Sequence, residues 1–439
     1  MRFTASDVAA CTGGMLRGPD ATADGISFDT RSTLPGQAFV AIVAGRDGHD
    51  FLVDAVSAGA AFAIVGRGRA VGSLPCVEVD DTGAAIASVG RMCRARIDAS
   101  ARGRVIGVTG SVGKTSTKDF VLAVLRAQWP GSHGSSLSFN NDIGVPVTLA
   151  NAPDDCPALV VEMGMRGHGE IARLCGVARP DVGIVTAVGD AHGERVGGIE
   201  GVARAKGELI QALPPGGTAV LNADDARVAA MRARTGARVL TYGAGPGADV
   251  RYSVVSVSPS GLHTVDVTWS DSTEQVEVPL PGLHMASNAC GAVAAGVAVG
   301  VPFADAVAAV AGVTGAPGRM QWRTAPDGTR VLDDSYNANP SSMEAALRTV
   351  AASPARHRFA VLGAMAEISD PESSHRETAR LCGELGITLV ALETDMYGVP
   401  PVGPAAAAAA VGARGEDVCV LVKGSRAART ERVVELLLD

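Results

Sequence analysis

The sequence has 439 residues, of which 47% are hydrophobic and 19% are charged, and its formal net charge is −8 at pH 7. This length exceeds what one hydrophobic core usually organises, so we expect two or three domains. The low charge density and the acidic balance argue against a protein that coats nucleic acid, and they favour small-molecule partners.

The sequence also argues against a membrane-spanning or exported protein and against a disulfide-bonded one. No run reaches the roughly 18 apolar residues that span a membrane, and the start MRFTASDVAACTGG lacks a basic segment followed by an apolar one. The eight cysteines include no CxxC pair, which indicates reduced core thiols. We expect a cytoplasmic protein without membrane insertion that works as a monomer.

The predicted elements begin with short strands broken by turns. Apolar runs at 38–42 and 61–66 suit a small α/β or α+β domain. Four strand-like runs follow at 104–108, 158–162, 182–188 and 218–222, each separated from the next by a helical length. This rhythm is typical of a parallel sheet.

The last part of the chain repeats this rhythm after a break. Residues 312–322 are rich in glycine and proline and resemble a linker. Strand-like runs then recur at 330–334, 359–363, 388–392 and 418–422, and six alanines at 405–410 suit a helix. The sequence therefore predicts an α/β protein with three domains at residues 1–102, 103–313 and 314–439.

The segment TGSVGKTS at 109–116 stands between an apolar strand and a helix. In a phosphate-binding loop, backbone N–H groups, the helix N-terminus and a lysine surround the phosphate oxygens. The usual spacing would place a glycine at Val108, and a glycine turn with a surface lysine is the alternative. We predict nucleotide binding by Thr109, Gly110, Ser111, Val112, Gly113, Lys114, Thr115 and Ser116.

Two polar residues follow the carboxyl ends of predicted strands, where parallel sheets bind ligands. Glu162 ends the run 158–162, and His192 follows the run 182–188. A carboxylate and a neutral imidazole can complete the shell of a Mg²⁺ held by phosphate oxygens and the Thr115 hydroxyl. Taken alone, Glu162 suits a helix cap and His192 a loop equally well.

Lys206 falls on an apolar stripe with helical spacing, formed by Ile199, Val202, Ala203, Leu209, Ile210 and Leu213. A lysine at such a position can extend its amine to the helix edge. Alternatively, burial lowers its pKa and leaves a neutral amine that reacts with CO₂ to form a carbamate. The sequence leaves both interpretations open.

Several motifs in this order resemble the Mur ligases of peptidoglycan synthesis, from about residue 24 to the end. They include TGSVGKTS, SFNNDIGVPVTL, VVEMGMRGHGEIARL, AHGERVGGIEGVARAKGEL, PGLHMASNACGA, LDDSYNANPSSMEAAL and VLVKGSRAARTERVV. Within the family, the chain is most similar to the branch that adds the D-alanyl-D-alanine dipeptide. It lacks both the GxGxxG start of the branches that add the first two residues and the Asn-Pro-Arg signature of the diaminopimelate-adding branch.

The resemblance implies a fold and an activity. It implies an N-terminal UDP-substrate-binding domain, a central P-loop ATPase domain with a parallel sheet, and a C-terminal Rossmann-like ligase domain. The implied reaction is ATP-dependent joining of the dipeptide to a UDP-linked muramoyl tripeptide through an acyl phosphate. ATP and Mg²⁺ would be needed because both reacting groups are anionic.

The resemblance also implies roles for individual residues. Lys114 would contact the β- and γ-phosphates and Thr115 the first Mg²⁺, while Glu162, His192 and carbamylated Lys206 would support a second metal. Further nucleotide contacts would come from His284, Asn288, Arg319, Asp334 and Asn337. The UDP-linked muramoyl peptide would be bound by Asp29, Thr30, Arg31, Asp47, His49, Asn140 and Asn141. Lys423 and Ser425 would line the C-terminal cleft.

The chain departs from the family pattern at two positions, and its segment between ALETD and VLVKGSR is short. Ala187 stands where the family usually has asparagine, and Ala364 stands where it usually has an acidic residue. These changes leave open a paralogue that ligates a different acid and amine in a specialised-metabolite pathway. A non-catalytic nucleotide-binding protein on the same fold is a third alternative, although it would be expected to lose metal or phosphate residues.

Overall fold

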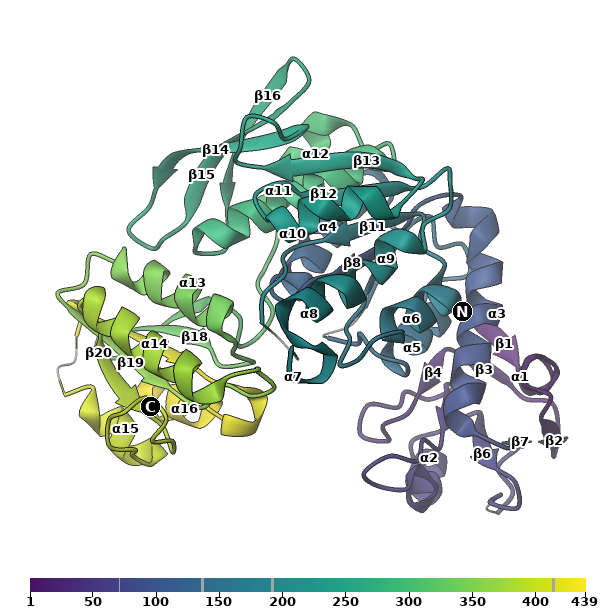
Figure 1. The fold of residues 1–439 in the computed structure, drawn as a ribbon. Coiled ribbons are helices and arrows are strands. Elements are labelled where there is room, and N and C mark those ends of the chain that lie inside the picture. The colour runs from purple at the N-terminus through teal and green to yellow at the C-terminus, as the bar shows by residue number, and fades with distance from the viewer. Residues whose placement is uncertain (71, 136–137, 191–192, 413–414) are drawn as a thin grey trace.

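The computed structural model describes residues 1–70, 72–135, 138–190, 193–412 and 415–439. Within these ranges the main strands form three successive sheets, which we call the N-terminal, central and C-terminal parts (Figure 1). The central part lies above the other two in this view, and the N- and C-terminal parts are separated from each other. None of the described helices is both long and apolar enough to cross a membrane.

In the N-terminal part, the described strands form a small antiparallel pair and a mixed sheet. The pair consists of β1 (Arg2–Thr4) and β3 (Thr22–Asp24). The sheet has the order β2 (Met15–Arg17), β7 (Cys76–Val79), β6 (Phe62–Gly66), β5 (Ala38–Val40), β4 (Ile26–Ser27), and β2 is its antiparallel member. The helical segments are α1 (Ala5–Thr12), η1 (Gly48–Phe51), α2 (Leu52–Ser57) and α3 (Thr82–Ala101).

The N-terminal part is joined to the central part by a shared core. Val89 of α3 and Val145 of the next part belong to one continuous cluster of buried apolar residues. The Asn151 side chain also pairs with the exposed backbone edge of β4, since its Oδ1 accepts from Ile26 N at 2.9 Å and its Nδ2 donates to Ile26 O at 2.9 Å. An amide side chain thus satisfies a strand edge that would otherwise lack a partner.

The central sheet has the order β16-β15-β14-β13-β12-β11-β8-β10-β9 in the described residues. Its parallel strands are β8 (Val105–Thr109), β9 (His133–Gly134), β10 (Leu159–Glu162), β11 (Val182–Val185), β12 (Thr218–Asn222), β13 (Arg238–Gly243) and β14 (Val250–Val257). The strands β15 (His263–Trp269) and β16 (Ser272–Val278) extend it antiparallel.

Helices cover both faces of this sheet, which explains why its strands are continuous apolar runs. Ile106 and Val108 of β8 pack in the cluster that contains α4 (Lys114–Gln128), α11 (Leu283–Ala298) and α12 (Phe303–Val310). Val105 faces the opposite cluster, as strand alternation requires. The remaining segments are α5 (Gly144–Ala150), α6 (Glu170–Ala178), α7 (Gly193–Val196), α8 (Gly198–Lys206), α9 (Glu208–Gln211), α10 (Ala226–Ala230) and η2 (Met231–Arg234).

The C-terminal sheet has the order β17 (Gln321–Thr324), β18 (Arg330–Asp334), β21 (Val418–Lys423), β19 (His357–Leu362), β20 (Thr388–Ala391). It is parallel except for β17, which pairs antiparallel with β18. Its helical segments are α13 (Pro340–Ala351), α14 (Pro371–Glu384), α15 (Pro404–Ala410), η3 (Arg426–Ala428) and α16 (Glu431–Leu438). Because β21 is central, its carboxyl end lies where open parallel sheets bind ligands.

The predicted α/β class and the strands named from sequence agree with this fold. The antiparallel extension by β15 and β16 was not predicted. The predicted helix around Lys206 is divided into α8 and α9 at Gly207, where a Cβ would lie 1.9 Å from Arg234 Nη1. The domain boundaries predicted after residues 102 and 313 fall between the sheets and stay predictions.

Candidate active site

A tight loop joins β8 to α4 and requires glycine at two positions. Gly110 has φ +153°, and a Cβ there would lie 1.8 Å from Thr186 Oγ1. Gly113 has φ +81°, and a Cβ there would lie 2.5 Å from Asn288 Oδ1. The glycines therefore permit both the turn and the close approach of neighbouring side chains, although their spacing differs from the usual one.

Two hydroxyl side chains at the start of this loop bond to backbone carbonyls of neighbouring segments. The Thr109 hydroxyl donates to Met163 O at 2.7 Å, and the Ser111 hydroxyl donates to Gly189 O at 2.8 Å. Thr109 is fully buried, so its side chain supports the loop from below. These bonds fix the loop between the ends of neighbouring strands of the sheet.

Lys114 is the first residue of α4 and folds back over the loop. Its Nζ donates to Gly110 O at 2.7 Å. Burial lowers the pKa of this amine, while the nearby Glu162 carboxylate opposes the shift. A lysine held in this position contributes its charge at the helix N-terminus, the part of a helix best suited to bind phosphate.

Glu162 accepts two side-chain hydrogen bonds next to the loop. Thr115 Oγ1 donates to its Oε2 at 2.7 Å, and Asn140 Nδ2 donates to its Oε1 at 2.7 Å. Glu162 is 1% exposed and ends β10, beside β8 in the sheet. The strand order therefore brings Thr115 and Glu162 together, as the prediction required.

The donor atoms at this point suit Mg²⁺, which prefers oxygen ligands and is commonly shared with substrate phosphates. The described residues contain no group of three His, Cys, Asp or Glu side chains arranged for a metal. Thr115 and Glu162 thus offer two oxygen ligands, and the rest would come from phosphate oxygens and water. His192, the predicted imidazole ligand, lies outside the described residues.

Lys206 ends α8 with its side chain inside the protein. The residue is 2% exposed, and no other described residue forms a hydrogen bond or ion pair with its Nζ. Burial holds the pKa of the amine well below its ordinary value, and the charge of Lys114 lowers it further. The side chain lines the same cleft as Lys114, so it does not extend to solvent at a helix edge.

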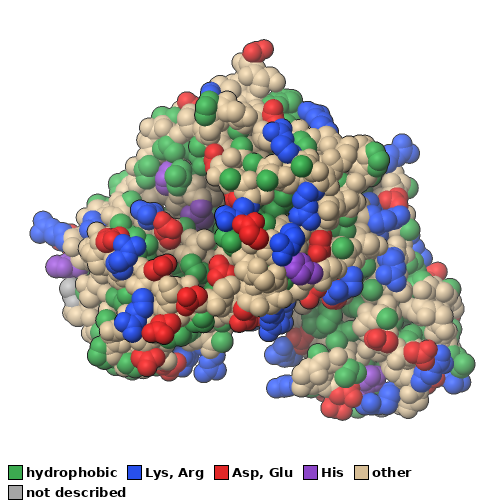
Figure 2. Space-filling model, viewed as in Figure 1, with side chains coloured by type: hydrophobic (Ala, Val, Ile, Leu, Met, Phe, Trp, Pro, Cys, Tyr) green, Lys and Arg blue, Asp and Glu red, His purple; other side chains and the backbone are tan. Residues whose placement is uncertain are grey.

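A cleft of about 850 Å³ joins these residues to the C-terminal part. Figure 2 shows a separate notch in the lower edge of the molecule, between the N-terminal part and the rest, with lysine and arginine side chains on its walls. The predicted residues that line the cleft are Ser111, Val112, Gly113, Lys114, Thr115, Ser116, Asn140, Asn141, Glu162, Lys206, His284, Arg319, Asp334, Asn337, Lys423 and Ser425. The other two predicted loop residues, Thr109 and Gly110, do not line the cleft, and Asn288 packs behind the loop against Gly113.

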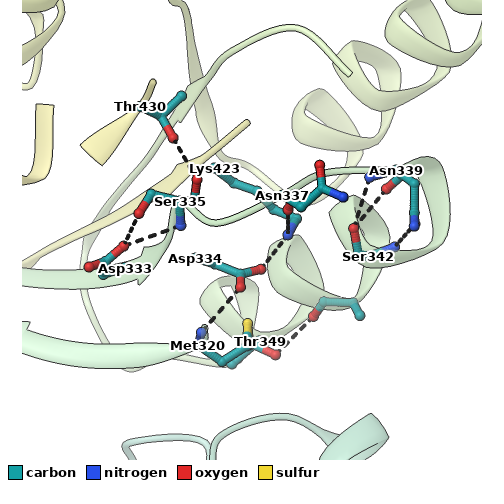
Figure 3. Close-up of polar contacts among 11 residues, drawn as sticks. Met320, Asp333, Asp334, Ser335, Asn337, Asn339, Ser342, Thr349, Lys423 and Thr430 are labelled. Carbon is teal, nitrogen blue, oxygen red and sulfur yellow. Dashed lines mark hydrogen bonds and ion pairs between the residues drawn. The ribbon is translucent and has the colours of Figure 1, made fainter. Parts of the chain in front are cut away.

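The C-terminal wall is organised around a buried ion pair (Figure 3). Lys423 Nζ contacts Asp334 Oδ2 and donates to Asn337 O at 2.8 Å. Burial raises the pKa of Asp334, and the Lys423 ammonium counteracts this effect. The pair connects the ends of β18 and β21, which are neighbours in the sheet.

Arg319 links this wall to the central part. Its Nη2 donates to Ser138 Oγ at 3.0 Å, and its guanidinium lies 4.1 Å from the centre of the Tyr336 ring. On the central side, burial lowers the pKa of His284 to about 4, and the charge of Lys423 contributes. His284 is therefore neutral at physiological pH and able to accept a hydrogen bond.

Residues predicted to bind the UDP group lie in the N-terminal part and do not line the cleft. Arg31 forms an ion pair with Asp29 at 2.6 Å, and both flank Thr30. His49 Nε2 accepts from Gly66 N at 2.8 Å and its Nδ1 contacts Asp47 at 2.6 Å, so both ring nitrogens are occupied. The His49 backbone N–H also bonds to Asp47 and lowers the pKa of that carboxyl to about 2.

At both departures from the family pattern, the backbone carbonyl bonds to a predicted site residue whatever the side chain. Ala187 O accepts from Ser111 N at 2.8 Å, and Ala364 O accepts from Ser425 N at 2.9 Å. Each alanine thus holds a predicted site residue with its carbonyl group. No side-chain hydrogen bond or ion pair is formed at either position in the described residues, so the structure does not explain these two substitutions.

Five residues that line the cleft were not predicted from the sequence, namely Ser138, Arg166, Tyr336, Glu367 and Arg426. Tyr336 and Arg426 stand inside the quoted motifs LDDSYNANP and VKGSR, where a search for polar or aromatic residues could have found them. Ser138 and Arg319 are 181 positions apart, and no local pattern indicates their contact.

The site therefore combines a glycine loop at a helix N-terminus, side-chain oxygens beside it and a wall from a separate sheet that carries Arg319 and Lys423. This arrangement defines a nucleotide-dependent enzyme of the kind that brings two anionic groups together.

Comparison with known proteins makes this assignment specific. The Mur ligase middle domain matches residues 108–296, and the Mur ligase glutamate ligase domain matches residues 318–437. The chain belongs to the Mur ligase family, whose members are ATP-dependent peptide ligases.

Named relatives and solved structures resemble the chain over nearly all of its length. The Escherichia coli K12 protein named UDP-N-acetylmuramoyl-tripeptide--D-alanyl-D-alanine ligase is 32% identical, over 99% of this chain and 98% of that protein. A crystal structure of MurF from Acinetobacter baumannii has a TM-score of 0.88 at 28% identity, covering 100% and 99% of the two chains. MurF ligase from Thermotoga maritima in complex with ADP gives 0.79 at 26% identity, covering 94% and 97%.

Proposed function

We propose that this protein joins D-alanyl-D-alanine to UDP-N-acetylmuramoyl-tripeptide as ATP is converted to ADP and phosphate, in peptidoglycan precursor synthesis. The observation that carries the proposal is the cleft in which Lys114 and Glu162 face Arg319 and Lys423. Similarity to the Escherichia coli ligase over nearly the full chain supports the choice of substrates. These substrates and ATP would place the enzyme in the cytoplasm, and we propose that it acts as a monomer.

The reaction would proceed in two chemical steps. A carboxylate oxygen of the tripeptide attacks the γ-phosphorus of ATP, which forms an acyl phosphate and releases ADP. The amine of the dipeptide then attacks the acyl carbon, and the tetrahedral intermediate releases phosphate as the amide forms. Both steps bring anionic groups together, so fixed positive charge lowers their barriers.

The chain's residues would divide this work between two walls. On the central wall, the loop N–H groups and Lys114 would bind the β- and γ-phosphates, and Asn288 would pack against the loop. On the facing wall, Arg319, Asp334 and Asn337 would contact the nucleotide, with His284 as a neutral partner from the central part. Lys423 and Ser425 would lie at the acyl acceptor.

Metal ions would be held by oxygen atoms beside the loop. Thr115 and Glu162 would bind Mg²⁺ together with phosphate oxygens, and Mg²⁺ supplies charge neutralisation when bound. We propose that Lys206 carries a carbamate and supports a second ion with His192. The buried amine of Lys206, which lacks a partner among the described residues, is what supports this assignment.

The UDP-linked substrate would extend from the N-terminal part to the cleft. Asp29, Thr30 and Arg31, with Asp47 and His49, would form the uridine end, and Asn140 and Asn141 the muramoyl end. The loops that carry these two ends touch, because the Phe28 and Phe139 rings lie 5.7 Å apart. Since both His49 nitrogens are occupied, His49 would act by positioning Asp47 and the backbone near Gly66.

Three domains, at residues 1–102, 103–313 and 314–439, would move relative to one another during catalysis. We propose that the C-terminal domain rotates about residues near 312–318 and excludes water from the acyl phosphate. Pro317 and Gly318 lie at this connection, and Gly318 has φ +68°. The Arg319–Ser138 bond is a contact that closure would form.

Phosphate release with purified enzyme tests the proposal. We expect release to require ATP, UDP-N-acetylmuramoyl-tripeptide and D-alanyl-D-alanine together, and to fall at least tenfold with other dipeptides or amino acids as the amine. Faster release with an unrelated acid and amine would support the specialised-metabolite alternative. ATP binding without release for any pair would support the non-catalytic alternative.

A further inference from the structure

Most cations of the cleft already have partners within the protein. Lys423 pairs with Asp334, and Arg319 bonds to Ser138. Arg166 lies 3.5 Å from the Glu367 carboxylate. These side chains are held in place, and carboxylates partly neutralise the charges of Lys423 and Arg166 before any substrate binds.

Arg426 differs from them. No carboxylate of the described chain forms an ion pair or hydrogen bond with its guanidinium, which lies 5.4 Å from the centre of the Tyr336 ring. The residue is exposed and lines the cleft. It begins η3, directly after the carboxyl end of β21 and beside Lys423 and Ser425. The aromatic ring can orient a guanidinium without neutralising it.

The proposed dipeptide substrate has a charge that the reaction does not use. Its amine attacks the acyl phosphate, while its free carboxylate lies about 7 Å further along an extended dipeptide. This carboxylate is repelled by the acyl phosphate and by ADP, so a separate cation is needed to bind it. The planar fork of arginine donates two parallel hydrogen bonds to a carboxylate, which suits this task better than a lysine.

We propose that Arg426 binds the C-terminal carboxylate of the incoming dipeptide and thereby selects a free dipeptide as the acyl acceptor. The inference rests on the proposed function and adds a specificity-determining residue to it. Lys423 and Ser425 place the amine end of the dipeptide next to the acyl phosphate, and Arg426 holds its far end.

Paired substrates and variants test this assignment. The two amines are D-alanyl-D-alanine and its C-terminal amide, which lacks the negative charge. Wild-type enzyme should prefer the free acid by about 10- to 100-fold in kcat/KM, the range for a charge-assisted hydrogen-bonded pair. Arg426→Gln should lose a similar factor on the acid through KM for the dipeptide, and change less than about threefold on the amide.

Controls separate a binding role from a structural one. Arg356→Gln removes an exposed arginine whose charge partner is Asp417, outside the cleft, and should leave both substrates unaffected. Arg426→Lys should recover part of the preference because it restores a charge without the fork. Melting temperatures of all three variants should match that of the wild type.

Two results would overturn the inference while leaving the proposed function intact. One is an equal loss by Arg426→Gln on the acid and the amide. The other is a rise in KM for ATP or the UDP-linked substrate with the dipeptide preference unchanged. Failure of the wild type to use D-alanyl-D-alanine at all would instead remove the proposed function, and this inference with it.

Discussion

The buried amine of Lys206 should make stability depend on pH in a way that one substitution isolates. Burial lowers the pKa of this amine in the folded protein, whereas an unfolded lysine titrates at about 10.4. Between those two values the unfolded chain binds a proton that the folded chain does not. Lowering the pH within that window therefore favours unfolding, and stability recovers as the pH rises towards 10.4.

The size of the effect follows from this linkage. Relative to a variant without the amine, the wild type should lose up to about 1.4 kcal/mol per pH unit across the window. Lys206→Met fills a similar volume without a polar atom, and it also removes the cost of burying an amine without a hydrogen bond, about 1–3 kcal/mol. We expect the variant to be more stable, and its advantage to widen as the pH falls below about 10.4.

Thermal melting in CO₂-depleted buffers at several pH values measures the difference. Lys118→Met is a matched control, because the buried Lys118 amine has partners at Asp119 (2.6 Å) and Ser135 O (2.9 Å), so its loss should destabilise. Wild-type and Lys206→Met melting temperatures that change in parallel with pH would refute the inference that the Lys206 amine is buried without a partner.

The proposed carbamate is tested by activity. Lys206→Ala should be nearly inactive and partly restored by acetate, and wild-type activity in that variant would contradict the assignment.

Three further predictions concern the loop, the contact between the walls and a buried histidine. Lys114→Ala should keep its fold but lose roughly 3 kcal/mol or more of transition-state stabilisation, and wild-type ATP turnover would contradict this. Asp190 accepts from Ser369 N and Oγ at 3.1 and 2.8 Å, so Asp190→Ala should weaken closure by about 1 kcal/mol and increase ADP formation without amide product; an unchanged ratio would count against the contact. Burial lowers the pKa of His375, whose Nε2 accepts from Met365 N at 2.9 Å, so its contribution to stability should be present above about pH 6.5 and lost as the pH falls. The loss of melting temperature between pH 7.5 and 5.5 should be smaller in His375→Phe, and an equal loss in both proteins would refute this role.

The sequence was informative where function depends on local pattern. The run TGSVGKTS predicted a strand, a tight turn and a helix, and the structure shows β8, the loop and α4 at those positions. Alternating apolar residues in β8 face two different cores, which is why the run was continuous rather than alternating between polar and apolar. For Lys206 on its apolar stripe the sequence left two interpretations open, and the structure shows the buried one.

Other features depend on contacts between distant segments. The neighbours of β8 are β10 and β11, an order that loop lengths do not reveal, and it is this order that places Glu162 beside Thr115. Asp190 and Ser369 are 179 positions apart. The strands β14 to β16 were not predicted, and in β14 the exposed Val254, Val255 and Val257 mean that the apolar residues do not mark one buried face.

Isotope transfer tests the central mechanism most directly. The reaction is run with UDP-N-acetylmuramoyl-tripeptide labelled with ¹⁸O in the carboxylate that is ligated, together with ATP and D-alanyl-D-alanine, and the released phosphate is analysed by mass. Because a carboxylate oxygen becomes the bridging oxygen of the acyl phosphate, one ¹⁸O should appear in each phosphate as the amide forms. Amide product accompanied by unlabelled phosphate would contradict the acyl-phosphate mechanism.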